Sequence, residues 1–281
     1  ARLITMACVS GFRALTPALP VDGTRAAVEI EVYTLLQADQ MTSNSKPAFT
    51  PRDRTWHPKG LTPAYNSSVL RSPKRALLQM PTSLSETSGP VFGHNMFGEH
   101  DADLLANAVV DGDPIGERIV VSGRVLDEYA RPQAGVLIEA WQANAGGRYR
   151  HVRDGYLAPL DENFSGYGRC LSDEQGNYSF RTIRPGPYPF PNNGPAWRPA
   201  HIHLSLFGAS FAQRLITQFY FEGDPLIRHC AIVNAVSDPA AVDRMVARLD
   251  LDNAVPFDAL AYRFDIVLRG RDETPLDAEH D

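Results

Sequence analysis

Residues 188–203 read Tyr-Pro-Phe-Pro-Asn-Asn-Gly-Pro-Ala-Trp-Arg-Pro-Ala-His-Ile-His and join a proline-rich segment to an apolar run. Between Arg184 and Pro199 lie six of the chain's 22 prolines. This density excludes a helix and leaves few N–H donors for strand pairing. We therefore expect a stiff loop that holds Tyr188 in a fixed place, followed by a strand.

His201 and His203 are separated by one residue in that strand, so both side chains point to the same face and could share one metal ion. The alternative is two ordinary strand histidines, one of them satisfied in the core. An Fe(II) facial triad needs a carboxylate as its third ligand, and a three-histidine zinc site needs another histidine. Position 202 is Ile, and no Glu follows His203 before Gly208, which counts against a cupin-type site. Tyrosines are plentiful instead, and a phenolate oxygen suits Fe(III).

Several further segments resemble the iron-bearing β subunits of protocatechuate 3,4-dioxygenase, a family of intradiol ring-cleaving enzymes. The resemblance extends from about Arg52 to Arg271. The segments that carry it are Trp141–His151, Gly168–Leu171, Tyr178–Ile183, Pro185–Pro189, Trp197–His203 and Leu215–Pro225.

The resemblance implies one Fe(III) per chain, bound by two tyrosinates and two histidines. The matching positions are Tyr149, Tyr188, His201 and His203. In this family one tyrosinate leaves the metal when the diol binds, and its position here is Tyr188. We therefore expect Tyr188 to accept a proton from the substrate.

The resemblance also implies roles at the substrate pocket. Catalytic roles fall on Tyr188, on Arg198, which would stabilise the bound ring, and on its neighbour Gln218. Read without the resemblance, Arg198 could equally form a surface ion pair. The matching substrate-binding positions are Tyr65, Trp141, Phe190 and Ile232. Phe190 departs from the family, because close relatives often have Trp there.

The implied reaction is cleavage of protocatechuate (3,4-dihydroxybenzoate) by O2 to 3-carboxy-cis,cis-muconate, a step of aromatic catabolism in the β-ketoadipate pathway. The implied partner is a homologous α subunit, in a larger assembly of αβ units. One alternative is a catechol or hydroxyquinol dioxygenase, although these usually carry a helical amino-terminal segment that the proline-rich arm does not resemble. A metal-free β-sandwich partner subunit and a zinc hydrolase are the alternatives from other classes.

The composition agrees with small-molecule chemistry. The chain has 281 residues, 43% of them hydrophobic, with 27 Lys and Arg against 33 Asp and Glu for a net charge of -6. No basic block indicates a nucleic-acid or anionic-membrane surface. Cys8, Cys170 and Cys230 form an odd, widely spaced set, which favours buried thiols in the cytoplasm over a disulfide framework.

We expect an all-β fold: a β-sandwich with long functional loops, an irregular amino-terminal arm and one helix in the carboxy-terminal region. The predicted parts are a 1–45 extension outside the fold, a 46–115 arm that contributes to the pocket and to subunit contacts, a 116–271 catalytic sandwich, and a mobile acidic 272–281 tail. Met41 could be the true start of the chain.

Strand-like runs with turn signals between them support the sandwich. They are Ile119–Leu126, Gly135–Gln142, Tyr178–Ile183, Ala200–Phe207, Leu215–Phe221 and Tyr262–Leu268. Long loops are expected at 144–168 and 184–199. The predicted helix begins after Asp238, a capping residue, with Pro239 in its first turn and an apolar stripe that reaches Leu249.

Overall fold

A computed structural model of the chain describes residues 56–73, 75, 97–192, 194–208 and 214–276. All of these belong to one compact unit, Phe49–Asp281. The predicted 1–45 extension, the proposed start at Met41, and Cys8 lie outside the described residues. None of the helices within the described ranges has the length and hydropathy of a membrane span.

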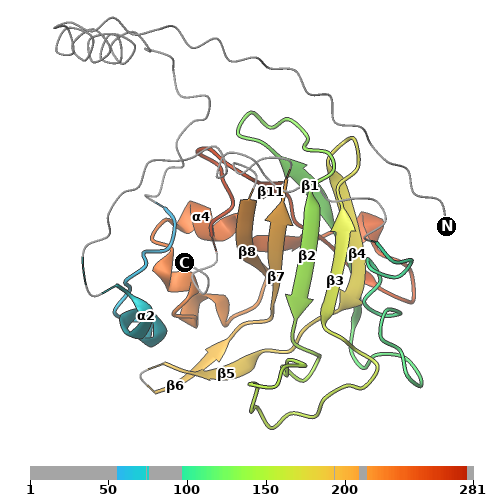
Figure 1. The fold of residues 1–281 in the computed structure, drawn as a ribbon, viewed down its shortest axis with the longest axis horizontal. Coiled ribbons are helices and arrows are strands. Elements are labelled where there is room, and N and C mark those ends of the chain that lie inside the picture. Colours follow the sequence, from blue (N-terminus) through green and yellow to red (C-terminus); the bar gives the residue numbers. More distant parts are fainter. Residues whose placement is uncertain (1–55, 74, 76–96, 193, 209–213, 277–281) are drawn as a thin grey trace, which may run out of the picture. The chain divides into compact units, whose positions relative to one another are not determined.

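One layer of the fold is an antiparallel sheet in the order β3-β2-β7-β8. Its strands are β2 (Leu137–Gln142), β3 (Tyr167–Leu171), β7 (His201–Phe207) and β8 (Arg214–Phe221). They run side by side through the middle of the view in Figure 1. This sheet supplies both histidines of the expected site.

The second layer is built around β1 (Arg118–Leu126). It pairs antiparallel with β4 (Asn177–Ile183) along one edge, and parallel with β10 (Leu260–Arg263) and β11 (Ile266–Val267) along the other. Strand β9 (Val246–Leu249) pairs parallel with β8 and antiparallel with β10. It therefore joins the two layers.

The core lies between the layers. Along β1, buried and partly exposed residues alternate, and Ile119, Val121 and Val125 point inward. They share one apolar cluster with Ile138 of β2 and Phe219 of β8. Full burial of such side chains stabilises the fold by about 1.5–3 kcal/mol each. The predicted all-β sandwich is confirmed, because two sheets pack around one core.

The predicted helix is only partly right. Helix α4 spans Pro239–Asp243, and Asp238 caps it by accepting a hydrogen bond from Ala240 N at 2.9 Å. The expected continuation to Leu249 is wrong, because residues 246–249 form β9. The apolar spacing fits either element, and pairing with a strand on each side decides for β structure.

The proline-rich segment also differs from expectation. It forms a hairpin of β5 (Tyr188–Pro191) and β6 (Pro195–Arg198) instead of an unpaired loop. Pro189 and Pro191 alternate with Tyr188 and Phe190, which leaves every second N–H for the antiparallel ladder. The hairpin lies beyond the main sheet in Figure 1, near the short helix α2 (Asn66–Arg71) of the arm.

Three 3-10 turns complete the described elements: Ile227–His229, Val233–Ala235 and Leu251–Asn253. The first two follow β8 and carry the chain toward α4.

The expectation of a mobile tail is wrong for residues 272–276. Glu273 is completely buried and its carboxylate lies 3.5 Å from His57 Nε2, while Thr217 Oγ1 donates to Pro275 O at 2.7 Å. Leu276 N donates to His57 Nδ1 at 3.2 Å. The buried contact between His57 and Glu273 and these hydrogen bonds hold the segment against the arm and β8.

Candidate active site

Strand β7 presents His201 and His203 side by side. Their ring centroids are 4.9 Å apart, and both side chains are buried. Ile202 between them is completely buried in the core cluster on the opposite face. The i, i+2 spacing of the strand therefore separates an imidazole face from an apolar face.

Two phenols converge on the same imidazole. Tyr149 Oη lies 3.4 Å and Tyr188 Oη 3.3 Å from His201 Nε2. The two tyrosine rings meet edge to face, with centroids 5.6 Å apart. The structure thus brings together all four side chains that the sequence suggested as metal ligands.

The loop after β2 holds Tyr149 through two polar side chains. Asn144 Oδ1 accepts hydrogen bonds from Gly146 N and Arg148 N at 3.0 Å. Asp154 Oδ2 accepts one from Tyr149 N at 2.7 Å. These bonds fix the backbone on both sides of the tyrosine, so its ring direction is defined without regular secondary structure.

A backbone carbonyl orients His201. Its Nδ1 lies 2.7 Å from Pro199 O and must donate to it, which leaves the Nε2 lone pair facing the two phenols. Burial, together with the nearby Arg198 and His203, holds the pKa of His201 well below its usual range. The imidazole is therefore neutral, which is the form that binds metals.

Arg198 is a buried cation beside Tyr188. Its side chain is 1% exposed, and Nη1 donates to Tyr188 Oη at 3.5 Å. The other guanidinium nitrogen, Nη2, donates to Gln218 Oε1 on β8. Gln218 is in turn the cross-strand partner of His203. The sheet therefore fixes the guanidinium next to a phenol, where it stabilises the phenolate form.

Trp141 contacts a histidine of the site directly. It is the cross-strand neighbour of His203, and the two rings stack with centroids 5.0 Å apart and planes 3° from parallel. The indole therefore restrains the imidazole plane. The predicted contact of Trp141 with substrate stays a prediction.

The other three expected substrate-binding residues lie in one apolar cluster. Tyr65 and Ile232 are buried in it, and Phe190 packs against it with its ring centroid 6.4 Å from that of Tyr65. The cluster also contains Tyr220, whose ring lies 6.0 Å from that of His201. Through Tyr220 it therefore borders His201.

The donor set fits one hard trivalent ion. Separations of 3.3–3.4 Å between donor atoms are those of ligands that share an ion through bonds of roughly 2 Å. Within the described ranges, no group of three or more His, Cys, Asp or Glu residues could hold a metal. The facial-triad and three-histidine alternatives therefore lack their third ligand there, whereas phenolate oxygens suit Fe(III).

Three supporting groups were missed from the sequence: the Pro199 carbonyl, Asp154, and Asp224, which accepts from Ala200 N at 3.1 Å just before β7. Asp154 precedes Gly155 and Asp224 precedes Pro225, so the sequence predicts a turn at each aspartate but not the hydrogen bond that it accepts. Every residue has a main-chain carbonyl, so the sequence cannot predict the role of the one at Pro199.

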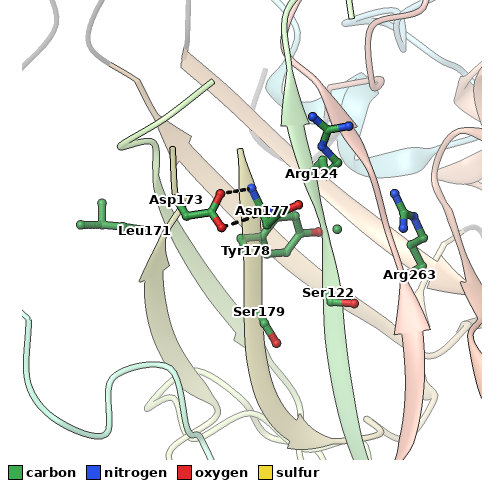
Figure 2. A pocket seen from close by; sticks show the side chains of 9 residues that line it. Ser122, Arg124, Leu171, Asp173, Asn177, Tyr178, Ser179 and Arg263 are labelled. Carbon is green, nitrogen blue, oxygen red and sulfur yellow. Dashed lines mark hydrogen bonds between the residues drawn. The ribbon is translucent and has the colours of Figure 1, made fainter. Parts of the chain in front are cut away.

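A hollow of about 380 Å³ lies elsewhere, on the second layer, as Figure 2 shows. Its arginine, asparagine and aspartate side chains already have partners within the fold. Asn177 Nδ2 donates to Asp173 Oδ2 at 3.0 Å, Arg124 Nη2 donates to Gln175 O at 3.2 Å, and Arg263 pairs with Asp265. The hollow does not include the histidines or the phenols, so we do not assign the chemistry to it.

Comparison with known proteins agrees with this geometry. A family model described as "Dioxygenase" matches residues 87–270, and one described as "Protocatechuate 3,4-dioxygenase beta subunit N terminal" matches residues 50–83. The protocatechuate 3,4-dioxygenase beta chain of Burkholderia cepacia is 50% identical over 234 residues, covering 83% of this chain and 99% of that relative. This chain belongs to the intradiol dioxygenases, in the family of protocatechuate 3,4-dioxygenase beta chains.

More distant intradiol dioxygenases are also similar to the chain. The protocatechuate 3,4-dioxygenase alpha chain of Pseudomonas putida is 29% identical over 205 residues, covering 69% of this chain and 95% of that relative. Among solved structures, 3-chlorocatechol 1,2-dioxygenase from Rhodococcus opacus 1CP is 27% identical with a TM-score of 0.45, covering 64% of this chain and 71% of that chain.

Proposed function

We propose that this intradiol dioxygenase is the iron-bearing β subunit of a protocatechuate 3,4-dioxygenase. It would break the bond between the two hydroxyl-bearing ring carbons of protocatechuate and add both atoms of O2, giving 3-carboxy-cis,cis-muconate. The observation that supports this most strongly is the convergence of Tyr149 and Tyr188 on His201, beside His203. The substrate comes from the name of the 50% identical relative.

These four residues would hold one Fe(III) per chain. When bound, the ion would supply a Lewis acid that favours the ionised diol and prepares its ring for O2. His201 can bind through Nε2 without first losing a proton, because Pro199 O already accepts its Nδ1 proton. His203 is held in plane by Trp141.

The diol must lose two protons as it binds. Tyr188 would take one of them, and a solvent hydroxide would take the other. The Tyr188 oxygen lies 3.5 Å from the Arg198 guanidinium, which stabilises the phenolate until the proton arrives. Tyr188 lies on the two-stranded β5–β6 hairpin, so it can turn away without breaking the main sheet. Tyr149 is the better permanent ligand, because Asp154 fixes its backbone.

Arg198 would then face the negative charge of the bound ring. Its guanidinium is buried and already oriented by Gln218, so little reorganisation is needed as charge develops. Tyr65, Phe190 and Ile232 would form the apolar wall of the pocket next to it.

The ring carboxylate of protocatechuate needs a cation of its own. Of the pocket residues proposed here, only Arg198 is cationic, and it serves the reacting ring. A buried carboxylate without a paired donor binds poorly. We therefore propose a homologous α subunit that supplies the missing charge at a shared pocket, with αβ units in a larger assembly. The similarity to an alpha chain supports this pairing.

The arm and the sandwich would have different roles. The 46–115 arm would contribute Tyr65 and subunit contacts, and the 116–271 sandwich would carry the metal ligands.

Cys170 and Cys230 are free buried thiols, which supports our expectation of a cytoplasmic enzyme.

Oxygen uptake tests the proposal. The chain should be purified alone and with a co-expressed α homologue, and each preparation assayed with protocatechuate and with unsubstituted catechol. We expect one O2 consumed per protocatechuate by the αβ preparation and little activity from the chain alone. A homo-oligomer fully active on protocatechuate would refute the partner, and preference for catechol would replace the proposed substrate.

A further inference from the structure

Asn192 connects the β5–β6 hairpin to the amino-terminal arm. Its Nδ2 donates to Ala64 O at 2.9 Å, and its Oδ1 accepts from Asn66 N at 2.7 Å. The residue between these two contacts is Tyr65. One side-chain amide thus holds the backbone on both sides of an expected pocket residue, although more than 120 positions separate the partners in sequence.

The start of helix α2 explains why this contact is needed. Tyr65 occupies the N-cap position and supplies no capping hydrogen bond, although Ser, Thr, Asp or Asn is usual there. Asn192 provides the absent acceptor from a distant segment, because its Oδ1 binds the N–H of the first helical residue, Asn66. A tyrosine at a position that favours a capping residue indicates a role for its ring.

The ring of Tyr65 packs against the β5–β6 hairpin. It is buried and meets Phe190 edge to face, two residues from Asn192 on the same hairpin. That hairpin also carries Tyr188 and Arg198 as a cross-strand pair. The hydrogen bonds of Asn192 therefore help to set the position of Tyr65 relative to Tyr188, the expected proton acceptor.

We propose that Asn192 is a positioning residue that fixes Tyr65 against the hairpin and thereby sets how closely the pocket fits the substrate ring. This inference rests on the proposed function. Asn192 would affect substrate binding rather than the chemical step, because it influences the pocket only through Tyr65. The arm is held independently by the buried His57–Glu273 pair, so loss of Asn192 loosens Tyr65 without releasing the arm.

Two substitutions separate the two hydrogen bonds. Asn192→Ala removes both. Asn192→Asp keeps an acceptor for Asn66 N–H and loses the donor to Ala64 O. The matched control is Asn253→Ala, an exposed asparagine whose Nδ2 donates to Asp250 Oδ2 at 2.7 Å in the turn before β10. All variants should be made in the iron-loaded αβ enzyme.

Steady-state kinetics on protocatechuate give the first readout. For Asn192→Ala we expect KM to rise roughly three- to tenfold with kcat within about twofold of wild type. This is the scale of one neutral hydrogen bond, because the two lost bonds affect the pocket only through Tyr65. Asn192→Asp should fall between wild type and Asn192→Ala, and Asn253→Ala should match wild type.

Hydrogen exchange of the Asn66 amide gives a second readout that needs no turnover. It should become faster in Asn192→Ala and stay slow in Asn192→Asp. Faster exchange with an unchanged KM would overturn the positioning role, because Asn192 would then be a helix cap alone. Unchanged exchange in Asn192→Ala would also overturn it. An inactive wild-type αβ enzyme would instead count against the proposed function, and the exchange result would still decide whether Asn192 fixes the backbone beside Tyr65.

Discussion

The backbone of Gly147 approaches the carbonyl group of Pro187 so closely that a Cβ atom added to Gly147 would lie 2.4 Å from the Pro187 oxygen. Gly147 also has a φ of +82°, a conformation that glycine adopts without strain. Two residues after Gly147 comes Tyr149, and directly after Pro187 comes Tyr188. This close packing of two loops is what brings the two phenols together.

Gly147→Ala should therefore separate the two phenols. We expect the free energy of unfolding to fall by roughly 2–5 kcal/mol from the clash and the positive φ, with loss of iron. Gly155→Ala in the same loop is the control, because its added Cβ would meet nothing within 4 Å. Thermal unfolding and metal analysis of both variants check this. Equal behaviour of the two would show that the close approach does not organise the site.

Substitutions of the proposed ligands should not be equivalent. Tyr149→Phe or His201→Ala should lose most of the iron, because each removes a donor that stays bound throughout. Tyr188→Phe should retain much of the iron and slow the binding of protocatechuate, because that phenolate must leave in any case. Metal analysis and stopped-flow binding under anaerobic conditions distinguish the cases. Equal iron loss in all three variants would contradict the role given to Tyr188.

Arg198→Ala should keep iron in place and lower kcat by about 10²-fold or more, the scale of one preorganised electrostatic group. The control is Arg263→Ala, which removes an exposed guanidinium paired with Asp265 on the other layer. Its kcat should match wild type. Unchanged turnover in an iron-replete Arg198→Ala enzyme would mean that the guanidinium serves only the fold.

The sequence and its family resemblance were sufficient for most of the sandwich and for the four proposed ligands. Runs of strand-favouring residues with turn signals between them predicted β1, β4 and β8. The two-residue period of a strand placed His201 and His203 on one face. Tyr149 and Tyr188 were indicated by the resemblance, since nothing in their spacing requires that they meet.

Other features could not be predicted because distant contacts decide them. The apolar residues of β9 fit a helix equally well, and only the flanking strands β8 and β10 select a strand. The burial of Glu273 depends on His57, more than 200 positions earlier. The bonds from Asn192 to the backbone beside Tyr65 have no signature in either segment.

Burial of Cys170 predicts a pH effect on stability. Burial raises the pKa of the Cys170 thiol to about 12. In the unfolded chain the pKa of this thiol is near 9.0, which is lower than in the folded chain. The thiol therefore makes its full contribution to the free energy of unfolding below pH 9, and this contribution decreases as the pH rises from 9 toward 12.

The free energy of unfolding should accordingly fall more steeply between pH 9 and 11 in the wild type than in Cys170→Ala. Denaturant titrations of the two proteins measure both slopes, and other titrating groups are common to both. Parallel slopes would show that this thiol does not couple to folding. Iodoacetamide at pH 8 should also leave Cys170 unmodified until the chain is unfolded.

Metal analysis and a visible absorption spectrum on one purified sample of the αβ enzyme test the central claim most directly. Two phenolates bound to Fe(III) donate charge into the ion, so the account predicts a red-brown protein with about one iron per chain, whose visible band changes when protocatechuate is added without O2. A colourless protein loaded with zinc, or an iron protein without a phenolate band, would contradict the assignment of Tyr149, Tyr188, His201 and His203 as ligands.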